Sequence, residues 1–136
     1  EGIDRIGGKA GNDILLGDMG DDLIWGDDGD DIVFGGEGND ILVGDNFSSG
    51  SGSDLFVFGT ENGTDTILDF AVGTDFIGLI TNELTFADLT LTQDGVNTSL
   101  GVTSSGKVLA TVCRHYQKIQ LSQAAREGSW TFELTI

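Results

Sequence analysis

Apolar residues recur at a fixed step of nine positions over the first third of the 136-residue chain. The step is kept by Ile6, Leu15, Ile24, Val33 and Leu42. Each of them follows an aspartate by two positions, as in the run 22–25, Asp-Leu-Ile-Trp. We expect each such run to form a very short strand whose recurring apolar side chain points inward. A fixed short period is typical of a solenoid, in which each unit buries its apolar face only against its neighbours.

The repeating unit is a nonapeptide with a constant order of residue types. The full units are GKAGNDILL (8–16), GDMGDDLIW (17–25), GDDGDDIVF (26–34) and GGEGNDILV (35–43), after a half unit GIDRIG (2–7). Glycine holds the first and fourth places, aspartate the sixth and a large apolar residue the eighth. Glycine permits a backbone with positive φ. We expect the Asn or Asp at the fifth place to adopt this left-handed region as well.

The strongly acidic charge indicates that this solenoid needs bound cations. The net charge is −17, and residues 1–57 contain 14 acidic and two basic side chains. Such a surface repels nucleic acid and anionic lipid, so we expect neither as a partner. No apolar run is long enough to span a membrane. Stacked sixth-place carboxylates repel one another, and a hard divalent cation with six to eight oxygen ligands relieves that repulsion.

The units resemble the repeat of the RTX (hemolysin-type) proteins, whose form is G-G-x-G-x-D-x-U-x with U large and apolar. This family forms a calcium-bound parallel β-roll in which two nonapeptides make one coil. The resemblance implies sixth-place carboxylate ligands on two edges of the roll, Asp4, Asp22 and Asp40 on one and Asp13 and Asp31 on the other. It also implies carbonyl ligands at the first, second and fourth places: Gly2, Gly8, Gly11, Gly17, Asp18, Gly20, Gly26, Asp27, Gly29, Gly35, Gly36 and Gly38. Lys9 stands at a second place, where its ammonium disfavours the Asp13 site.

The register breaks after Asp45 and resumes five residues late. Gly52, Asp54 and Phe56 then return to the fourth, sixth and eighth places. We interpret this as a loop insertion near 45–50, with Asp54 back at a ligand position. The alternative is a flexible linker between two domains.

The stretch 56–79 resembles the segment that closes the roll in serralysin-type secreted proteases. The resemblance implies that Asp65 and Asp69 complete the last calcium sites, with Asp75 as a further candidate. Asp65 and Asp75 each follow Gly-Thr, so both could instead be turn aspartates. Strand signals over 89–93, 98–102 and 107–112, separated by turns, predict antiparallel hairpins, and 130–136 alternates as a final strand.

The sequence therefore predicts an all-β protein: a calcium-bound parallel β-roll over 1–57, followed by a β-sandwich-like C-terminal cap over 58–136. We expect a calcium-binding module, with about four or five ions, at the C-terminus of a larger secreted protein. By resemblance it leaves the cell through a type I exporter and folds outside on binding calcium. The last four residues, 133–136, are either part of the export signal or an ordinary closing strand.

Two alternative functions follow from other features of the sequence. One is an extracellular binding or adhesion module for a polysaccharide or a surface layer, with Trp25 and Phe34 as an exposed surface; packing is the alternative role for these rings. The other is an enzyme, which we do not expect. The sequence lacks H-E-x-x-H. Cys113 and His115 are better explained as a small buried thiol and a surface imidazole than as a nucleophile and its base.

Overall fold

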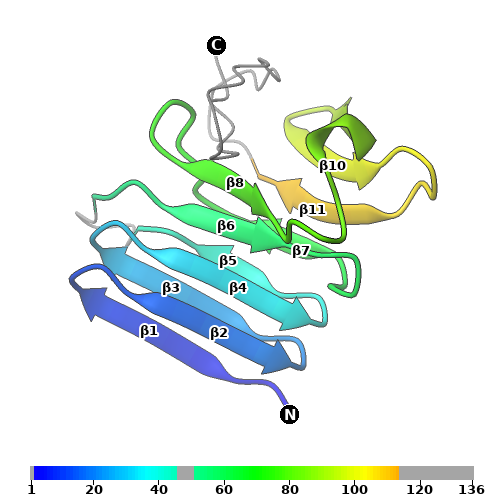
Figure 1. The fold of residues 1–136 in the computed structure, drawn as a ribbon. Helices are drawn as coiled ribbons and strands as arrows, with labels where there is room; N and C mark the ends of the chain where they lie inside the picture. Colours follow the sequence, from blue (N-terminus) through cyan, green and yellow to red (C-terminus); the bar gives the residue numbers. More distant parts are fainter. Residues whose placement is uncertain (1, 46–50, 114–136) are drawn as a thin grey trace.

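The computed structural model describes residues 2–45 and 51–113, which form two β-sheets and one short 3-10 helix, η1 (Phe86–Asp88) (Figure 1). Sheet A has the strand order β1 (Arg5–Ala10), β3 (Leu23–Asp28), β5 (Ile41–Val43), β7 (Asp65–Ile67), β11 (Val108–Val112), β10 (Asn97–Val102) and β9 (Leu89–Asp94). Sheet B has the order β2 (Ile14–Met19), β4 (Ile32–Glu37), β6 (Leu55–Phe58) and β8 (Phe76–Leu79). The predicted all-β parallel roll is confirmed.

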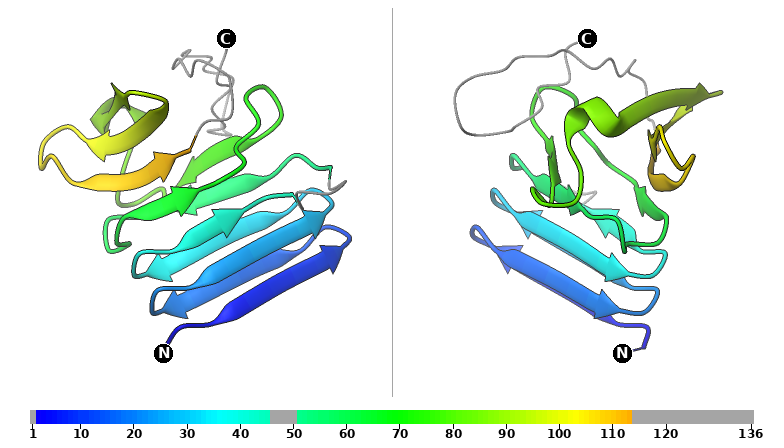
Figure 2. Two further views of the ribbon diagram at one scale, coloured as in Figure 1. Left: turned by 180° about the vertical axis from the view of Figure 1, so that it is seen from behind. Right: turned by 45° about the vertical axis from the view of Figure 1, so that its right-hand side comes forward.

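Successive nonapeptides alternate between the two sheets, so units two apart stack in parallel. Arg5 lies opposite Leu23 in sheet A, and Ile14 lies opposite Ile32 in sheet B. Both pairs are one coil of two nonapeptides apart. Figure 2 shows the coils stacked as steps along one axis, with strands of neighbouring coils side by side. The predicted stacking of alternate units is thus confirmed.

The strands are longer than the very short runs predicted from the sequence. Strand β3, for example, runs from the seventh place of one unit through the first-place Gly26 to the third place of the next. The pairing of β1 with β3 continues past the first-place glycines, since Lys9 still lies opposite Asp27. The parallel neighbour in the next coil keeps the backbone extended here, a contact that the local residue pattern does not reveal.

The insertion leaves the parallel register intact. Ile32 lies opposite Leu55, and the backbone N–H of Asp31 donates to Asp54, 23 residues further along. The parallel pairing continues past residue 57, since β7 pairs with β5 and β8 with β6. Asp54 therefore resumes its place in the coil. The boundary between residues 57 and 58 stays a prediction.

The predicted hairpins follow the roll. Strand β9 pairs antiparallel with β10, and β10 antiparallel with β11. Strand β11 then pairs in parallel with β7, with Ala110 opposite Asp65, so the hairpins extend sheet A beyond the last coil (Figure 1). Residues 114–136, which include the predicted final strand, lie outside the described residues.

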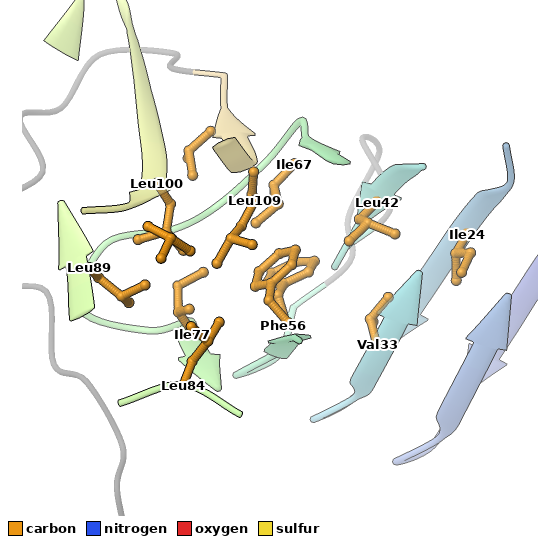
Figure 3. Close-up of a cluster of buried hydrophobic side chains, with 14 of the residues drawn as sticks. Ile24, Val33, Leu42, Phe56, Ile67, Ile77, Leu84, Leu89, Leu100 and Leu109 are labelled. Carbon is orange, nitrogen blue, oxygen red and sulfur yellow. The ribbon is translucent and has the colours of Figure 1, made fainter. Parts of the chain in front are cut away.

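The core is a row of eighth-place side chains between the two sheets. Ile24, Val33, Leu42 and Phe56 are fully buried, and Leu15 is 8% exposed. Figure 3 shows this row passing through Ile67 and Ile77 into the leucines of the hairpin region. Each fully buried aliphatic side chain contributes about 1.5–3 kcal/mol relative to exposure. Roll and hairpins thus share one hydrophobic cluster, which fixes the turns where the acidic residues lie.

Candidate calcium sites

Sixth-place aspartates form two hydrogen-bonded ladders, one along each edge of the roll. In each step the backbone N–H of one aspartate donates to Oδ1 of the aspartate one coil further along, at 2.8 to 3.2 Å. The first ladder contains Asp4, Asp22, Asp40 and Asp65, and the second contains Asp13, Asp31, Asp54 and Asp75. The stacking brings together, edge by edge, the aspartates that the sequence assigned to each edge.

Of the two candidate ligands Asp69 and Asp75, only Asp75 lies in a ladder. Asp75 completes the second ladder, and its Oδ2 also accepts from the backbone N–H of Ala71 at 2.7 Å. Asp69 lies outside both ladders and accepts from the backbone N–H groups of Gly44 and Asp45, at 2.9 and 2.8 Å. Asp75 is therefore a turn aspartate and a ladder member at once, whereas Asp69 ties the last coil to Gly44.

The second oxygen of most ladder aspartates is buried without a partner. Among the described residues, Oδ2 has no hydrogen-bond partner in six of them: Asp13, Asp22, Asp31, Asp40, Asp54 and Asp65. Leaving one buried polar group unsatisfied costs about 1–3 kcal/mol, and more for a charged group. Six such oxygens in two rows can be compensated by protons or by bound cations.

First-place glycines bring these oxygens next to backbone carbonyls. A Cβ on Gly8 would lie 2.8 Å from Oδ2 of Asp13 and 2.6 Å from the carbonyl oxygen of Gly26, one coil on. A Cβ on Gly17 would likewise lie 2.6 Å from Oδ2 of Asp22. The missing side chain leaves a small space with a carboxylate and a carbonyl oxygen on its border.

The second and fourth places adopt the left-handed backbone that turns the chain between sheets. The fourth-place Gly20 has φ 131°, and a Cβ there would overlap the carbonyl oxygen of Gly2. The second-place Lys9, Asp18 and Asp27 have φ 78°, 73° and 74°. Lys9 therefore shares the left-handed φ of the other second places.

The expectation for the fifth place was wrong. No Asn or Asp at the fifth place of a described unit has a positive φ. Their side chains instead form outer ladders: Asn12 accepts from the backbone N–H of Asp30 at 3.1 Å, and Asp21 accepts from that of Asn39 at 2.9 Å. A short side chain with an oxygen is needed because it reaches the next coil, and the turn itself is made at the neighbouring places.

Burial raises the pKa values of the deepest carboxyl groups. Burial, reinforced by nearby carboxylates, raises the pKa of Asp54 and of Asp65 to about 7, although backbone N–H donors oppose the shift. The pKa of Asp75 rises to about 6 for the same leading reason. The pKa values of Asp31 and Asp40 are also raised by burial. These carboxyl groups resist ionisation unless a cation lies beside them.

Asp45 is not among the ligands predicted from the sequence. Its Oδ1 is buried without a hydrogen-bond partner, and burial together with Asp69 and Asp28 raises its pKa. Asp45 follows Gly44 just as Asp18 and Asp27 follow their first-place glycines. That second-place position was the available signal, but the break in register obscured it.

The donor set fits a hard cation and is made of oxygen alone. Within residues 2–45 and 51–113 no three His, Cys, Asp or Glu side chains come together as a metal-binding group. A complete shell of six to eight oxygens must therefore draw on the turn carbonyls as well as on Oδ2. Calcium suits this mixture, because it accepts carboxylate and carbonyl oxygens in flexible geometry.

Other sequence candidates lie apart from the ladders. Trp25 is on β3 of sheet A and Phe34 on β4 of sheet B, both half-buried, so they do not form one exposed surface. Consecutive units belong to opposite sheets, which separates these rings. Cys113 is half-buried and free, while His115 and residues 133–136 lie outside the described residues. In the described part of the chain, no helix has the length and apolar character needed to cross a membrane.

These features define a parallel β-roll with acidic, glycine-lined turns. Residues 7–42 and 20–49 match the family model of the RTX calcium-binding nonapeptide repeat, in four copies. The repeat segment of the chain therefore carries RTX calcium-binding nonapeptide repeats, and such repeats generally bind calcium. No curated protein sequence matches the chain.

Two solved structures are similar to the fold. The AlgE6R3 subunit of the Azotobacter vinelandii mannuronan C5-epimerase is 28% identical, with a TM-score of 0.52 over 81% of this chain and 69% of that one. The AlgE6R2 subunit of the same enzyme is 25% identical, with a TM-score of 0.49 over 82% of this chain and 85% of that one.

Proposed function

We propose that this chain is a non-catalytic, calcium-binding module of a larger secreted protein, and that it folds when it meets calcium outside the cell. The observation that carries the proposal is the set of six buried Oδ2 atoms without partners in the two aspartate ladders. Five of them, those of Asp13, Asp22, Asp31, Asp40 and Asp54, lie next to a first-place glycine. Bound calcium would supply the positive charge that these carboxylates lack.

The energetics favour a switch rather than a permanently folded roll. Without a cation, ladder carboxylates one coil apart repel each other, and burial penalises their charged forms. A ligand that binds only the folded state stabilises it by an amount that grows with its concentration. Extracellular calcium modules commonly bind at about 10⁻⁴–10⁻³ M. Such an affinity leaves the chain unfolded in the cytosol and folded outside.

The ion count and the export route are further parts of this proposal. About four or five ions, each bringing +2, would offset roughly 8–10 of the negative charges. An unfolded, strongly charged chain suits passage through a type I exporter. Residues 133–136, Glu-Leu-Thr-Ile, are the candidate for the end of its signal.

Far-UV circular dichroism during a calcium titration tests the folding switch. The proposal predicts a cooperative gain of β signal between a calcium-depleted buffer and about 10 mM calcium, and no such gain with magnesium. Magnesium demands a smaller, near-octahedral shell and gives up its water reluctantly. A chain that is fully folded in chelator and indifferent to calcium would rule the switch out.

A second candidate is an extracellular binding module, favoured by the similarity to the AlgE6R3 subunit of an epimerase that acts on mannuronan. A polyanionic sugar needs positively charged side chains on the roll, and within residues 1–57 only Arg5 and Lys9 are basic. Both are exposed on β1. Calorimetric titration of calcium-loaded chain with mannuronan oligomers tests this, and the pair Arg5→Ala and Lys9→Ala should abolish any binding.

A further inference from the structure

The outer face of sheet B is apolar. The eighth-place side chains of this sheet point into the core, so the seventh- and ninth-place side chains beside them point outward. On β2, the outward Ile14 and Leu16 are 65% and 56% exposed. The outward side chains on the other strands are half-buried, and Val57 is buried. We call the accessible surface the sheet B face; it consists of Ile14, Leu16, Ile32, Phe34, Leu55 and Phe76.

The sheet B face is continuous across all four strands. Ile14 pairs with Ile32, Ile32 with Leu55, and Leu55 with Phe76, which makes one apolar column along the roll axis. Leu16 and Phe34 begin a second column beside it. Four strands at about 4.8 Å spacing give a stripe about 14 Å long, and the two columns lie about 7 Å apart. In these columns Ile14 and Leu16 are exposed and the side chains of β4, β6 and β8 are half-buried, so the apolar stripe is most accessible at β2.

Acidic side chains border this stripe. No residue of β2, β4, β6 or β8 is Lys or Arg. Exposed acids lie near the strand ends. Glu37 is the last residue of β4, Asp30 lies just before the start of β4, and Asp21 lies just after the end of β2. The two basic residues of the repeat region are on β1, in the other sheet.

We infer that the sheet B face binds an amphipathic helix with an apolar stripe and basic flanks, supplied by another polypeptide. A helix about 10 Å wide, laid along the roll axis, would cover both columns, and about ten residues at 1.5 Å rise span the 14 Å stripe. Its Lys or Arg residues would meet the acids at the strand ends. This role goes beyond calcium-driven folding.

Charge favours a helix with basic flanks over two other partners of an apolar face, a second copy of the chain and an anionic lipid surface. A second copy docked through the same face would bring the acids of one copy, among them Glu37 and Asp30, close to the acids of the other, because a twofold interface uses the same surface on both subunits. An anionic lipid surface would be repelled for the same reason. A helix with basic flanks is attracted at long range and still covers the apolar columns.

The test uses the full chain at saturating calcium, so that its failure is separate from failure of the folding switch. The probe is a synthetic leucine–lysine peptide with an amphipathic helical pattern, and the control probe has the same composition in scrambled order. Isothermal titration calorimetry should give saturable one-to-one binding of the patterned peptide and at least tenfold weaker binding of the scrambled one. The double variant Ile14→Ser, Leu16→Ser and the separate variant Glu37→Lys should each weaken binding at least tenfold.

Matched controls lie in the hairpin region. Val96 is 69% exposed and Asp94 is exposed, so Val96→Ser and Asp94→Lys remove equivalent groups far from the stripe and should leave binding unchanged. Calcium-loaded circular dichroism should be the same for all variants, and Glu37→Lys remains a test should the double variant unfold. Three results would overturn the inference: equal binding of the scrambled peptide, unchanged binding by both sheet B variants, or a self-associating chain that Ile14→Ser, Leu16→Ser makes monomeric.

Discussion

The backbone N–H of Asp22 donates to Oδ1 of Asp40 at 2.8 Å, while Oδ2 of Asp40 is buried without a hydrogen-bond partner. One carboxylate thus has two roles. Oδ1 joins neighbouring coils and sets their register, and Oδ2 is left free for a cation. Because every interior coil repeats this relationship, calcium binding and the register of the roll depend on the same side chains.

Removing a ladder carboxylate should weaken calcium-driven folding. Asp22→Ala and Asp31→Ala each delete an unpartnered Oδ2 and an acceptor for a backbone N–H of the preceding coil. We expect each to raise the calcium midpoint by about tenfold or more, as losses around metal sites commonly do. The measurement is the circular dichroism titration, with the exposed Asp94→Ala as control. Midpoints equal to that of the control would contradict the role of the ladders.

Asp40→Asn separates the two roles of the carboxylate. The amide oxygen can still accept from the N–H of Asp22, but the negative charge is gone. The variant should fold at least as well as the wild type in calcium-depleted buffer, since repulsion falls, and should need more calcium to reach full stability. Thermal unfolding with and without calcium measures both effects. A variant with unchanged calcium stabilisation would show that hydrogen bonding alone explains the ladder.

Adjacent glycines in β1 offer a matched pair. In Gly8→Ala the new Cβ would meet Oδ2 of Asp13 and the carbonyl of Gly26, whereas in Gly7→Ala its nearest contact is Asp27 at 3.8 Å. We expect Gly8→Ala to destabilise the calcium-loaded chain by about 1–3 kcal/mol, as overpacking does. Gly7→Ala should be neutral or slightly stabilising. Urea denaturation in calcium gives the comparison, and equal effects of the two variants would argue against the glycine-lined space.

Acidification should partly replace calcium. The folded pKa of Asp54 and of Asp65 is about 7, above the value of about 3.9 for an exposed aspartate. The folded chain therefore binds protons that the unfolded chain does not, so the metal-free fold gains stability as pH falls from about 7 towards 4 and loses it as pH rises through 7. Circular dichroism without calcium should show more β signal at pH 5.5 than at pH 8. The opposite order would contradict this.

Protons should also compete with calcium over the same window. In calcium, the midpoint of the folding transition should rise as pH falls below about 7, because protonated Asp54 and Asp65 are poor ligands. Titrations at several pH values give the slope. A midpoint independent of pH between 5.5 and 8 would mean that these carboxyls do not take part.

Deletion of residues 46–50 should leave the roll intact. The deletion joins Asp45 to Ser51. The stretch from Gly44 to Val57 then becomes one nine-residue unit, GDSGSDLFV. The backbone N–H of Asp31 would still donate to Asp54, which would then lie one coil of two nonapeptides further along. Because loop length affects closure entropy only weakly, stability should change by less than about 1 kcal/mol. Loss of cooperative folding, measured by urea denaturation in calcium, would contradict the interpretation of this segment as an insertion.

Most of the roll could be predicted because the repeat is regular. The nine-residue step of Leu15, Ile24 and Val33 fixed which side chains are buried, and the alternation of units fixed which aspartates share an edge. Strand length could not be predicted in this way. It depends on the neighbouring coil, which holds Gly26 in an extended strand.

The end of the roll was less predictable because coil length varies there. Ladder steps of 23, 25 and 21 residues end at Asp54, Asp65 and Asp75. With no constant step, the local sequence could not tell Asp75 from Asp69. The fifth place was misread for a related reason. Asn12 and Asp21 have a turn-forming side chain, but its oxygen is used by the next coil rather than by its own turn.

The most direct test of the central claim is a crystal structure grown in calcium, with an anomalous difference map. The account predicts calcium density between coils, about 2.3–2.6 Å from Oδ2 of Asp22 and Asp31 and from carbonyls of the first-place glycines that border them, Gly35 and Gly44. A folded chain without density along the ladders, or with calcium only on exposed carboxylates such as Glu37, would contradict it.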